Sequence, residues 1–161
     1  MATPTNLPAS FSVGQTLTAA NMNNIRGAFR VLQVITATNS TLVGTGSTTM
    51  SDTGLTVNIT PSATSSKILV FAVGTGATTA SGQGVSYRLM RGSTEIRKAN
   101  NIIYDGYLGT QGNWTFLYLD SPATTSATTY KIQFALGVGS GTVYNNPDTN
   151  TSDIVVCEIS A

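Results

Sequence analysis

From Val31 onward, apolar and polar side chains alternate along the chain with a period of two. Leu55, Val57 and Ile59 alternate with threonine and asparagine, and residues 129–137 repeat the pattern. A β-strand points successive side chains to opposite faces, so the alternation predicts half-buried strands. The predicted strands, which are separated by turns rich in glycine, serine and threonine, are 31–37, 47–52, 54–60, 67–74, 85–91, 95–99, 113–120, 129–137, 141–145 and 153–159.

Short strands at regular spacing predict an all-β fold. About eight to ten of them suit an antiparallel, jelly-roll-like sandwich of two stacked sheets. Two connections support this assignment, because residues 91–95 are typical of a hairpin turn and residues 60–64 contain a proline that ends a strand.

The first 30 residues have a different pattern. Pro4 and Pro8 exclude a regular helix near the start, so residues 1–16 are predicted to be an extended polar arm. One short helix is predicted after the arm. We therefore divide the chain into an arm with a helix, residues 1–30, and a β-sandwich domain, residues 31–161.

The predicted helix has one apolar face. Thr18 can cap its N-terminus, and Leu17 can pack on Met22 as a hydrophobic staple. Met22, Ile25 and Phe29 recur at helical spacing and share a face. Because so short a helix is not stable alone, we expect Leu17, Met22, Ile25 and Phe29 to anchor the chain on a partner protein.

The chain carries little charge, which excludes several kinds of partner. Only 9% of its 161 residues are charged and the net charge is +1, whereas about 25% is typical. We expect no nucleic-acid partner, since there is no dense basic cluster. We expect no membrane insertion, since the longest apolar run is 68–73. The start of the chain lacks the features of a secretory signal, so we expect synthesis in a cytoplasm with Cys157, the single cysteine, reduced.

Three strand segments, 68–73, 114–119 and 154–157, are apolar on both faces. Sandwich strands normally keep one solvated face, so these segments predict a second burial surface. The N-terminal segment could cover it, but one short helix is too small for three strands. We therefore expect a homo-oligomer, with a trimer as the favoured state. The predicted interface residues are Phe71, Trp114, Phe116, Tyr118, Val155 and Cys157.

The chain lacks the residues that most catalytic sites use. It has no histidine, so a serine–histidine or cysteine–histidine pair is excluded. The spacing of its seven acidic residues places no two carboxylates on one strand face, as a glycosidase site would need. We expect no enzymatic activity, no catalytic residue and no cofactor.

Two segments suggest binding, each with a simpler interpretation. Residues 145–148 and Asp153 offer oxygen atoms that calcium prefers, but an Asx-rich turn explains them equally, and we assign no metal site. A second set of residues suggests a glycan-binding face, although aromatic residues in strands more often belong to a core or interface. This set comprises Arg88, Arg91, Tyr104, Tyr107 and Trp114.

Several segments resemble proteins of tailed-bacteriophage particles. Residues 10–23 resemble a short opening found on many tailed-phage virion proteins. A domain of phage tail-fibre and head-decoration proteins is similar to the segments 52–70, 88–94, 119–131 and 152–161. Together the similar segments extend over most of residues 31–161, and they consist mainly of turns and strand sequences.

The resemblance implies a virion accessory protein without catalytic residues, made in the host cytoplasm and located in the virion. Such domains often end a long fibre chain, whereas few residues precede the domain here. This arrangement favours a capsid decoration (cement) or head-fibre protein, attached through residues 1–30 to the major capsid protein or another virion protein. The alternative is a short tail-fibre, baseplate or receptor-binding protein that recognises a host-surface glycan.

Overall fold

The predicted alternation forms ten β-strands in the computed structural model, which describes residues 14, 16, 31–104 and 109–160. The predicted helix and the anchor residues Leu17, Met22, Ile25 and Phe29 lie outside the described residues. The elements are β1 (Val31–Asn39), β2 (Val43–Thr45), β3 (Ser51–Ile59), β4 (Lys67–Ala77), β5 (Gly84–Arg91), β6 (Thr94–Tyr104), β7 (Gln111–Asp120), β8 (Thr128–Val138), β9 (Val143–Asn145), the 3-10 helix η1 (Pro147–Thr149) and β10 (Ser152–Ile159).

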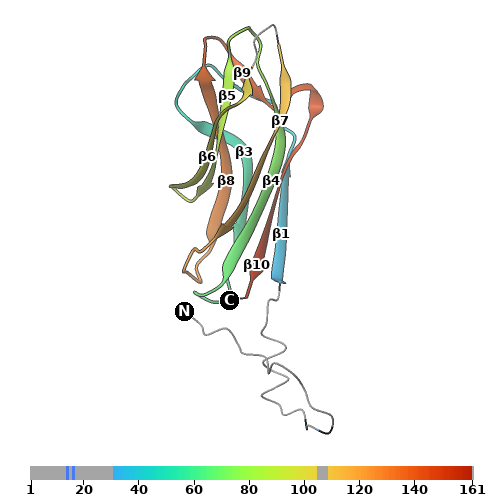
Figure 1. Cartoon of the computed structure of the whole chain (residues 1–161), viewed down its shortest axis with the longest axis vertical. Helices are drawn as coiled ribbons and strands as arrows, with labels where there is room; N and C mark the ends of the chain where they lie inside the picture. The colour runs from blue at the N-terminus through green and yellow to red at the C-terminus, as the bar shows by residue number, and fades with distance from the viewer. Residues whose placement is uncertain (1–13, 15, 17–30, 105–108, 161) are drawn as a thin grey trace.

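The strands form two antiparallel sheets that face each other (Figure 1). In the first, sheet A, the long strands lie in the order β1-β10-β4-β7. The short strands β9 and β2 extend this sheet beside the C-terminal end of β4. In the second, sheet B, the order is β3-β8-β5-β6. Apart from the β5–β6 hairpin, successive long strands alternate between the sheets, which is the connectivity of a jelly-roll-like sandwich.

The core lies between the sheets and takes alternate residues from each strand. From β3 it takes Leu55, Val57 and Ile59, as the alternation predicts. Its centre is aromatic: the Tyr87 ring centroid lies 5.0 Å from that of Trp114 and 6.0 Å from that of Phe134. The Tyr87–Trp114 stack joins the two sheets, because Tyr87 lies on sheet B and Trp114 on sheet A.

The sequence prediction and the structure differ mainly where strands bulge. Segments 47–52 and 54–60, predicted as two strands, contribute instead to the single strand β3, whose pairing with β8 shifts between Asp52 and Thr56. Gly54 makes the bulge possible, since its φ of +87° suits glycine. Strand β6 continues five residues beyond the predicted 95–99 because a bulge at Asn101, with φ of +49°, lets pairing resume.

The sequence predicts the two turns more accurately than it predicts the strand boundaries. Residues 91–95 form the β5–β6 hairpin, with Arg91 paired to Thr94 and Gly92 at a φ of +56°. A positive φ at the first central residue is what a two-residue type II′ hairpin loop requires. The proline segment 60–64 follows the end of β3, as predicted.

The tight packing around Gly74 gives a test of the core. A Cβ atom there would lie 2.1 Å from Ser152 Oγ and 2.4 Å from Trp114 Cζ2, and the indole is held by its stacking on Tyr87. We predict that Gly74→Ala lowers the free energy of unfolding by about 1–3 kcal/mol through overpacking. Urea denaturation measures this change. Thr115→Ala, on the exposed side of β7, is the control and should change stability by about 0.5 kcal/mol or less. Equal effects of the two substitutions would contradict this account of the core.

Candidate assembly surface

The outer face of sheet A carries apolar side chains in register across four strands. One row across β1, β10, β4 and β7 is Val34–Cys157–Leu69–Leu119. The next row, two residues further along, is Thr36–Val155–Phe71–Leu117, and the third is Thr38–Asp153–Val73–Thr115. We call the apolar members of these rows the apolar A face: Val34, Leu69, Phe71, Val73, Leu117, Leu119, Val155 and Cys157.

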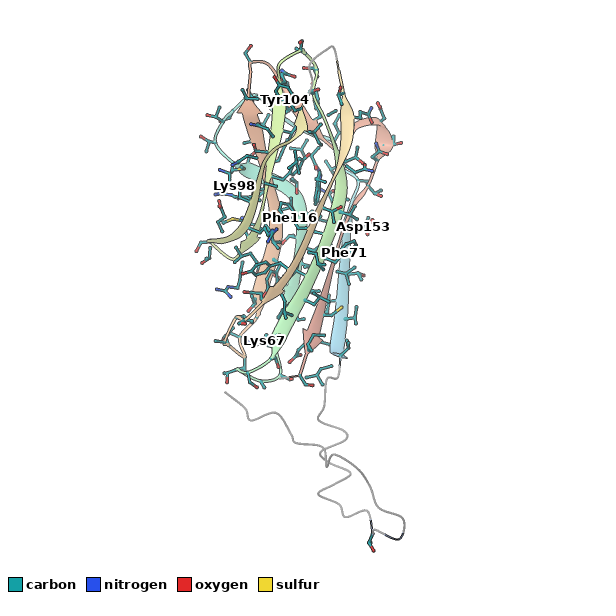
Figure 2. All side chains as sticks on the ribbon, viewed as in Figure 1. Lys67, Phe71, Lys98, Tyr104, Phe116 and Asp153 are labelled. Atoms are coloured by element: carbon teal, nitrogen blue, oxygen red, sulfur yellow. The ribbon has the colours of Figure 1, made fainter. Side chains whose placement is uncertain are left out.

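These side chains are accessible to solvent. Leu117 is 61% exposed, Leu119 57%, Val34 56% and Phe71 43%, and the remaining members are half-buried between them. In Figure 2, Phe71 lies on β4 near the middle of the sandwich, on the side away from sheet B. The solvated face of a sandwich sheet is usually polar. A contiguous apolar face of this kind is therefore a candidate interaction surface.

The outer face of sheet B has the opposite character. Lys131 Nζ lies 2.9 Å from Asp52 Oδ1, and Gln133 Nε2 donates to the same oxygen at 2.6 Å. Arg88 Nε donates to Gln133 Oε1 at 2.7 Å, and Arg88 Nη1 lies 3.0 Å from Glu95 Oε2. These contacts form a continuous polar chain over all four strands of sheet B. This face is suited to water, so the two outer faces of the sandwich are chemically unlike.

The structure divides the predicted interface residues into two groups. Phe71, Val155 and Cys157 lie on the apolar A face. Trp114 and Phe116 were wrongly predicted, because they point inward and belong to the core at 1% and 2% exposure. Tyr118 is half-buried and packs against the same core.

The outward residues of β7 were missed, as were those of β1. Leu117 and Leu119 are the most exposed members of the apolar A face, yet they alternate with Trp114, Phe116 and Tyr118 in one apolar run. The apolar run 114–119 predicts that both faces of this strand are buried. Residue size favours the aromatic side chains of this run as the interface, but the core between the sheets takes Trp114 and Phe116 instead.

The segments singled out for binding have structural roles. Asn146 Nδ2 donates to the carbonyl oxygen of Asn39 at 2.8 Å, and Asn146 Oδ1 accepts from Ser152 Oγ at 2.5 Å. Asn145 Oδ1 accepts from Trp114 Nε1 at 3.3 Å. These contacts match the Asx-rich turn interpretation. Among the described residues, no group of three or more acidic or cysteine side chains is placed to hold a metal ion. No helix in the described part of the chain is long and apolar enough to cross a membrane.

Among the described residues, those suggested for a glycan-binding face do not form one surface. Trp114 is in the core, Tyr107 lies outside the described residues, and Tyr104 is exposed at the end of β6. Arg91 Nη1 lies 2.9 Å from Asp120 Oδ1, and Tyr130 Oη donates to Asp120 Oδ2 at 2.6 Å. Burial and this hydrogen bond raise the pKa of Tyr130. The Arg91–Asp120–Tyr130 cluster joins β5 and β8 to β7, which makes it a link between the sheets.

A buried carboxylate lies on the inner side of β10, one residue from Cys157 of the apolar A face. Glu158 on β10 points inward and is fully buried. Its Oε1 accepts from the Ser62 amide at 2.7 Å, from Ser62 Oγ at 2.6 Å and from Ser66 Oγ at 2.7 Å. Its Oε2 accepts from Gln33 Nε2 at 2.6 Å. Burial alone would raise the pKa of Glu158, but these hydrogen bonds outweigh it and lower the pKa to about 2.

The described residues therefore define a jelly-roll-like β-sandwich with one polar and one apolar outer face. No protein-family model matches the chain, and no curated protein sequence matches it. Among solved structures it is similar to the VP2 subviral particle of infectious bursal disease virus, with 11% identity and a TM-score of 0.44 over 79% of this chain and 38% of that chain. A structure of the Gx strain of the same virus gives 10% identity and a TM-score of 0.43 over 80% of this chain and 40% of that chain. This chain thus spans about two fifths of each viral chain.

The Glu158 cluster predicts loss of stability in acid. Because the folded-state pKa of about 2 lies below the ordinary value of 4.5, the carboxylate stabilises the fold fully above pH 4.5, and this contribution is lost as the pH falls towards 2. The contribution is on the order of 3 kcal/mol. Glu158→Gln should therefore lower the free energy of unfolding at pH 7 by about this amount, and the difference from the unsubstituted protein should shrink between pH 4.5 and pH 2.

Denaturant unfolding at a series of pH values measures both effects. Glu95→Gln is the matched control, since that carboxylate is exposed and its removal should cost less than about 1 kcal/mol. A difference between the Glu158→Gln variant and the unsubstituted protein that stays constant down to pH 2 would contradict the assignment.

Proposed function

We propose that this protein is a non-enzymatic structural component of a bacteriophage particle. The observation that carries the proposal is the apolar A face, which lies opposite a polar face with two ion pairs on the same sandwich. A protein that works alone in water gains nothing from such a face, whereas an assembled protein buries it. The resemblance of residues 10–23 and of the sandwich segments to tailed-phage virion proteins supports a virion as the assembly.

The more specific role that we propose is capsid decoration (cement) or head fibre. Strand β1 begins at the end of the sandwich where β10 finishes, and Tyr104 lies at the opposite end (Figures 1 and 2). A chain attached through residues 1–30 would therefore project its sandwich lengthwise from the attachment point. The proposed partner is the major capsid protein or another virion protein, contacted by Leu17, Met22, Ile25 and Phe29. We propose a homo-oligomer located in the virion.

Attachment to particles tests the proposal. Phage particles lacking the protein are incubated with the purified protein and sedimented, and the bound protein is counted by quantitative mass spectrometry. We predict that the full chain binds in hundreds of copies per particle, as a repeating capsid lattice provides, and that a chain lacking residues 1–30 stays folded but does not bind. About a dozen copies or fewer would point to a tail location instead.

A paired substitution sharpens the anchor test. Ile25→Asp places a charge on the predicted apolar helix face, whereas Asn24→Asp places the same charge outside it. We predict that only Ile25→Asp reduces binding to particles, by at least tenfold, because a desolvated charge costs well over 1.4 kcal/mol in an interface. Equal binding by the two variants would contradict the proposed anchor.

A receptor-binding role is a second candidate, favoured by the end of the sandwich that carries Tyr104. Tyr104 is 58% exposed there, and Val138 and Ile102 are also exposed. Tyr104 pairs with Gly84, and the Asn101 and Val138 side chains fill the space above that glycine. The exposed ring of Tyr104 offers a flat face on which a sugar ring could stack. Adsorption of the purified protein to host cells, lost in Tyr104→Ala, would favour this candidate.

A further inference from the structure

We propose that the apolar A face is covered by a second copy of this chain, packed face to face on its own apolar A face. The proposal rests on the assembled role proposed above and names the partner of that surface. It is argued from the size of the face, from its charge and from the geometry of sheet packing.

The area is close to what a specific interface needs. The rows lie on four strands about 4.8 Å apart, and the face with its rim extends over about seven residues at about 3.4 Å each, which gives roughly 450 Å². Two such faces packed together bury about 900 Å², just below the ~1,000 Å² expected of a biological interface. We therefore expect reversible self-association that depends on concentration.

The position of the charges favours an identical partner. On the four long strands of sheet A, the two outward charged side chains are Lys67 and Asp153, which lie at opposite ends of the apolar A face. Lys67 Nζ donates to Ser121 Oγ at 2.7 Å, and Asp153 Oδ1 accepts from Thr38 Oγ1 at 2.5 Å. Between these ends, no charge would be buried when two copies of the face meet. A two-fold interface must be complementary to itself, and an uncharged apolar face fulfils this condition.

The packing required is one that the protein already uses. Its two sheets stack through interdigitating side chains, and sheets pack in this way about 10 Å apart. A second copy would repeat that arrangement outside sheet A, with Phe71 and Leu117 central in the contact because they neighbour each other in the middle row. Sheet B does not need such a partner, because Asp52, Arg88 and Lys131 on its outer face are already paired.

Leu117→Asp tests the proposal. Leu117 is 61% exposed on a single copy, so an aspartate there leaves the core intact but places a charge inside the proposed contact. Thr56→Asp is the matched control, because Thr56 is exposed on sheet B and pairs with Lys131, which tolerates the charge. Circular dichroism verifies that both full-length variants fold, and Leu117→Asn is the replacement if the aspartate variant does not.

The mass of the full-length chain is measured by sedimentation velocity from about 1 µM to about 1 mM, a range that covers the expected weak affinity. We expect the unsubstituted chain and Thr56→Asp to approach twice 16.7 kDa, the mass of a face-to-face dimer, as concentration rises. Leu117→Asp should remain at 16.7 kDa or associate at least tenfold more weakly. Cys157 provides a second readout, since its modification by N-ethylmaleimide should slow on association in the unsubstituted chain but not in Leu117→Asp.

Each other result overturns the proposal. A single-chain mass with a reactive Cys157 would mean that the face is open to a different protein. A single-chain mass with a protected Cys157 would mean that the chain's own N-terminal segment covers the face. An oligomer that survives Leu117→Asp would place self-association elsewhere. Particle binding is measured separately, so the virion role can fail while self-association holds, and the reverse is also true.

Discussion

Two stacked sheets can bury only one face of each sheet, and this constraint determines the rest of the structure. The inner faces are filled by the stacked rings of Tyr87, Trp114 and Phe134 and by the aliphatic residues around them. The outer faces must then meet water or a partner. Sheet B meets water through its chain of ion pairs and amide contacts. Sheet A keeps aliphatic rows, and this difference between the faces makes sheet A the side through which we propose that the protein assembles.

Buried polar groups at both ends of the sandwich fasten its connections. At one end, Glu158 collects four hydrogen bonds from β1 and from the β3–β4 connection. Towards the other end, Gln83 Oε1 accepts from the Thr79 and Ala80 amides, and Gln83 Nε2 donates to the carbonyl oxygen of Ser140 at 2.5 Å. Buried polar groups that are fully paired favour one geometry over near alternatives. The apolar A face lies between these two clusters, on strands whose connections the clusters hold in place.

The strands could be predicted because alternation is a local signal. It located all eight long strands, and the hairpin at Gly92 followed from turn chemistry. The bulges at Gly54 and Asn101 could not be predicted, since they depend on how a neighbouring strand pairs. The same limit applies to the candidate surface. An apolar run shows that both faces are buried, but only the register with β4 decides that Trp114 faces the core and Leu117 faces out.

The pairing of the first strand with the last has a consequence for synthesis. In the described part of the chain, strand β1 joins sheet A through β10 alone, so Val34 meets Cys157 only after almost the whole chain has left the ribosome. Contacts so distant in sequence form slowly, and chains generally begin to fold from the N-terminus while they are made. The complete rows of the apolar A face therefore do not exist on a nascent chain. The proposed self-association through this face would therefore follow completion of the fold, so that chains still on neighbouring ribosomes would not join through an incomplete surface.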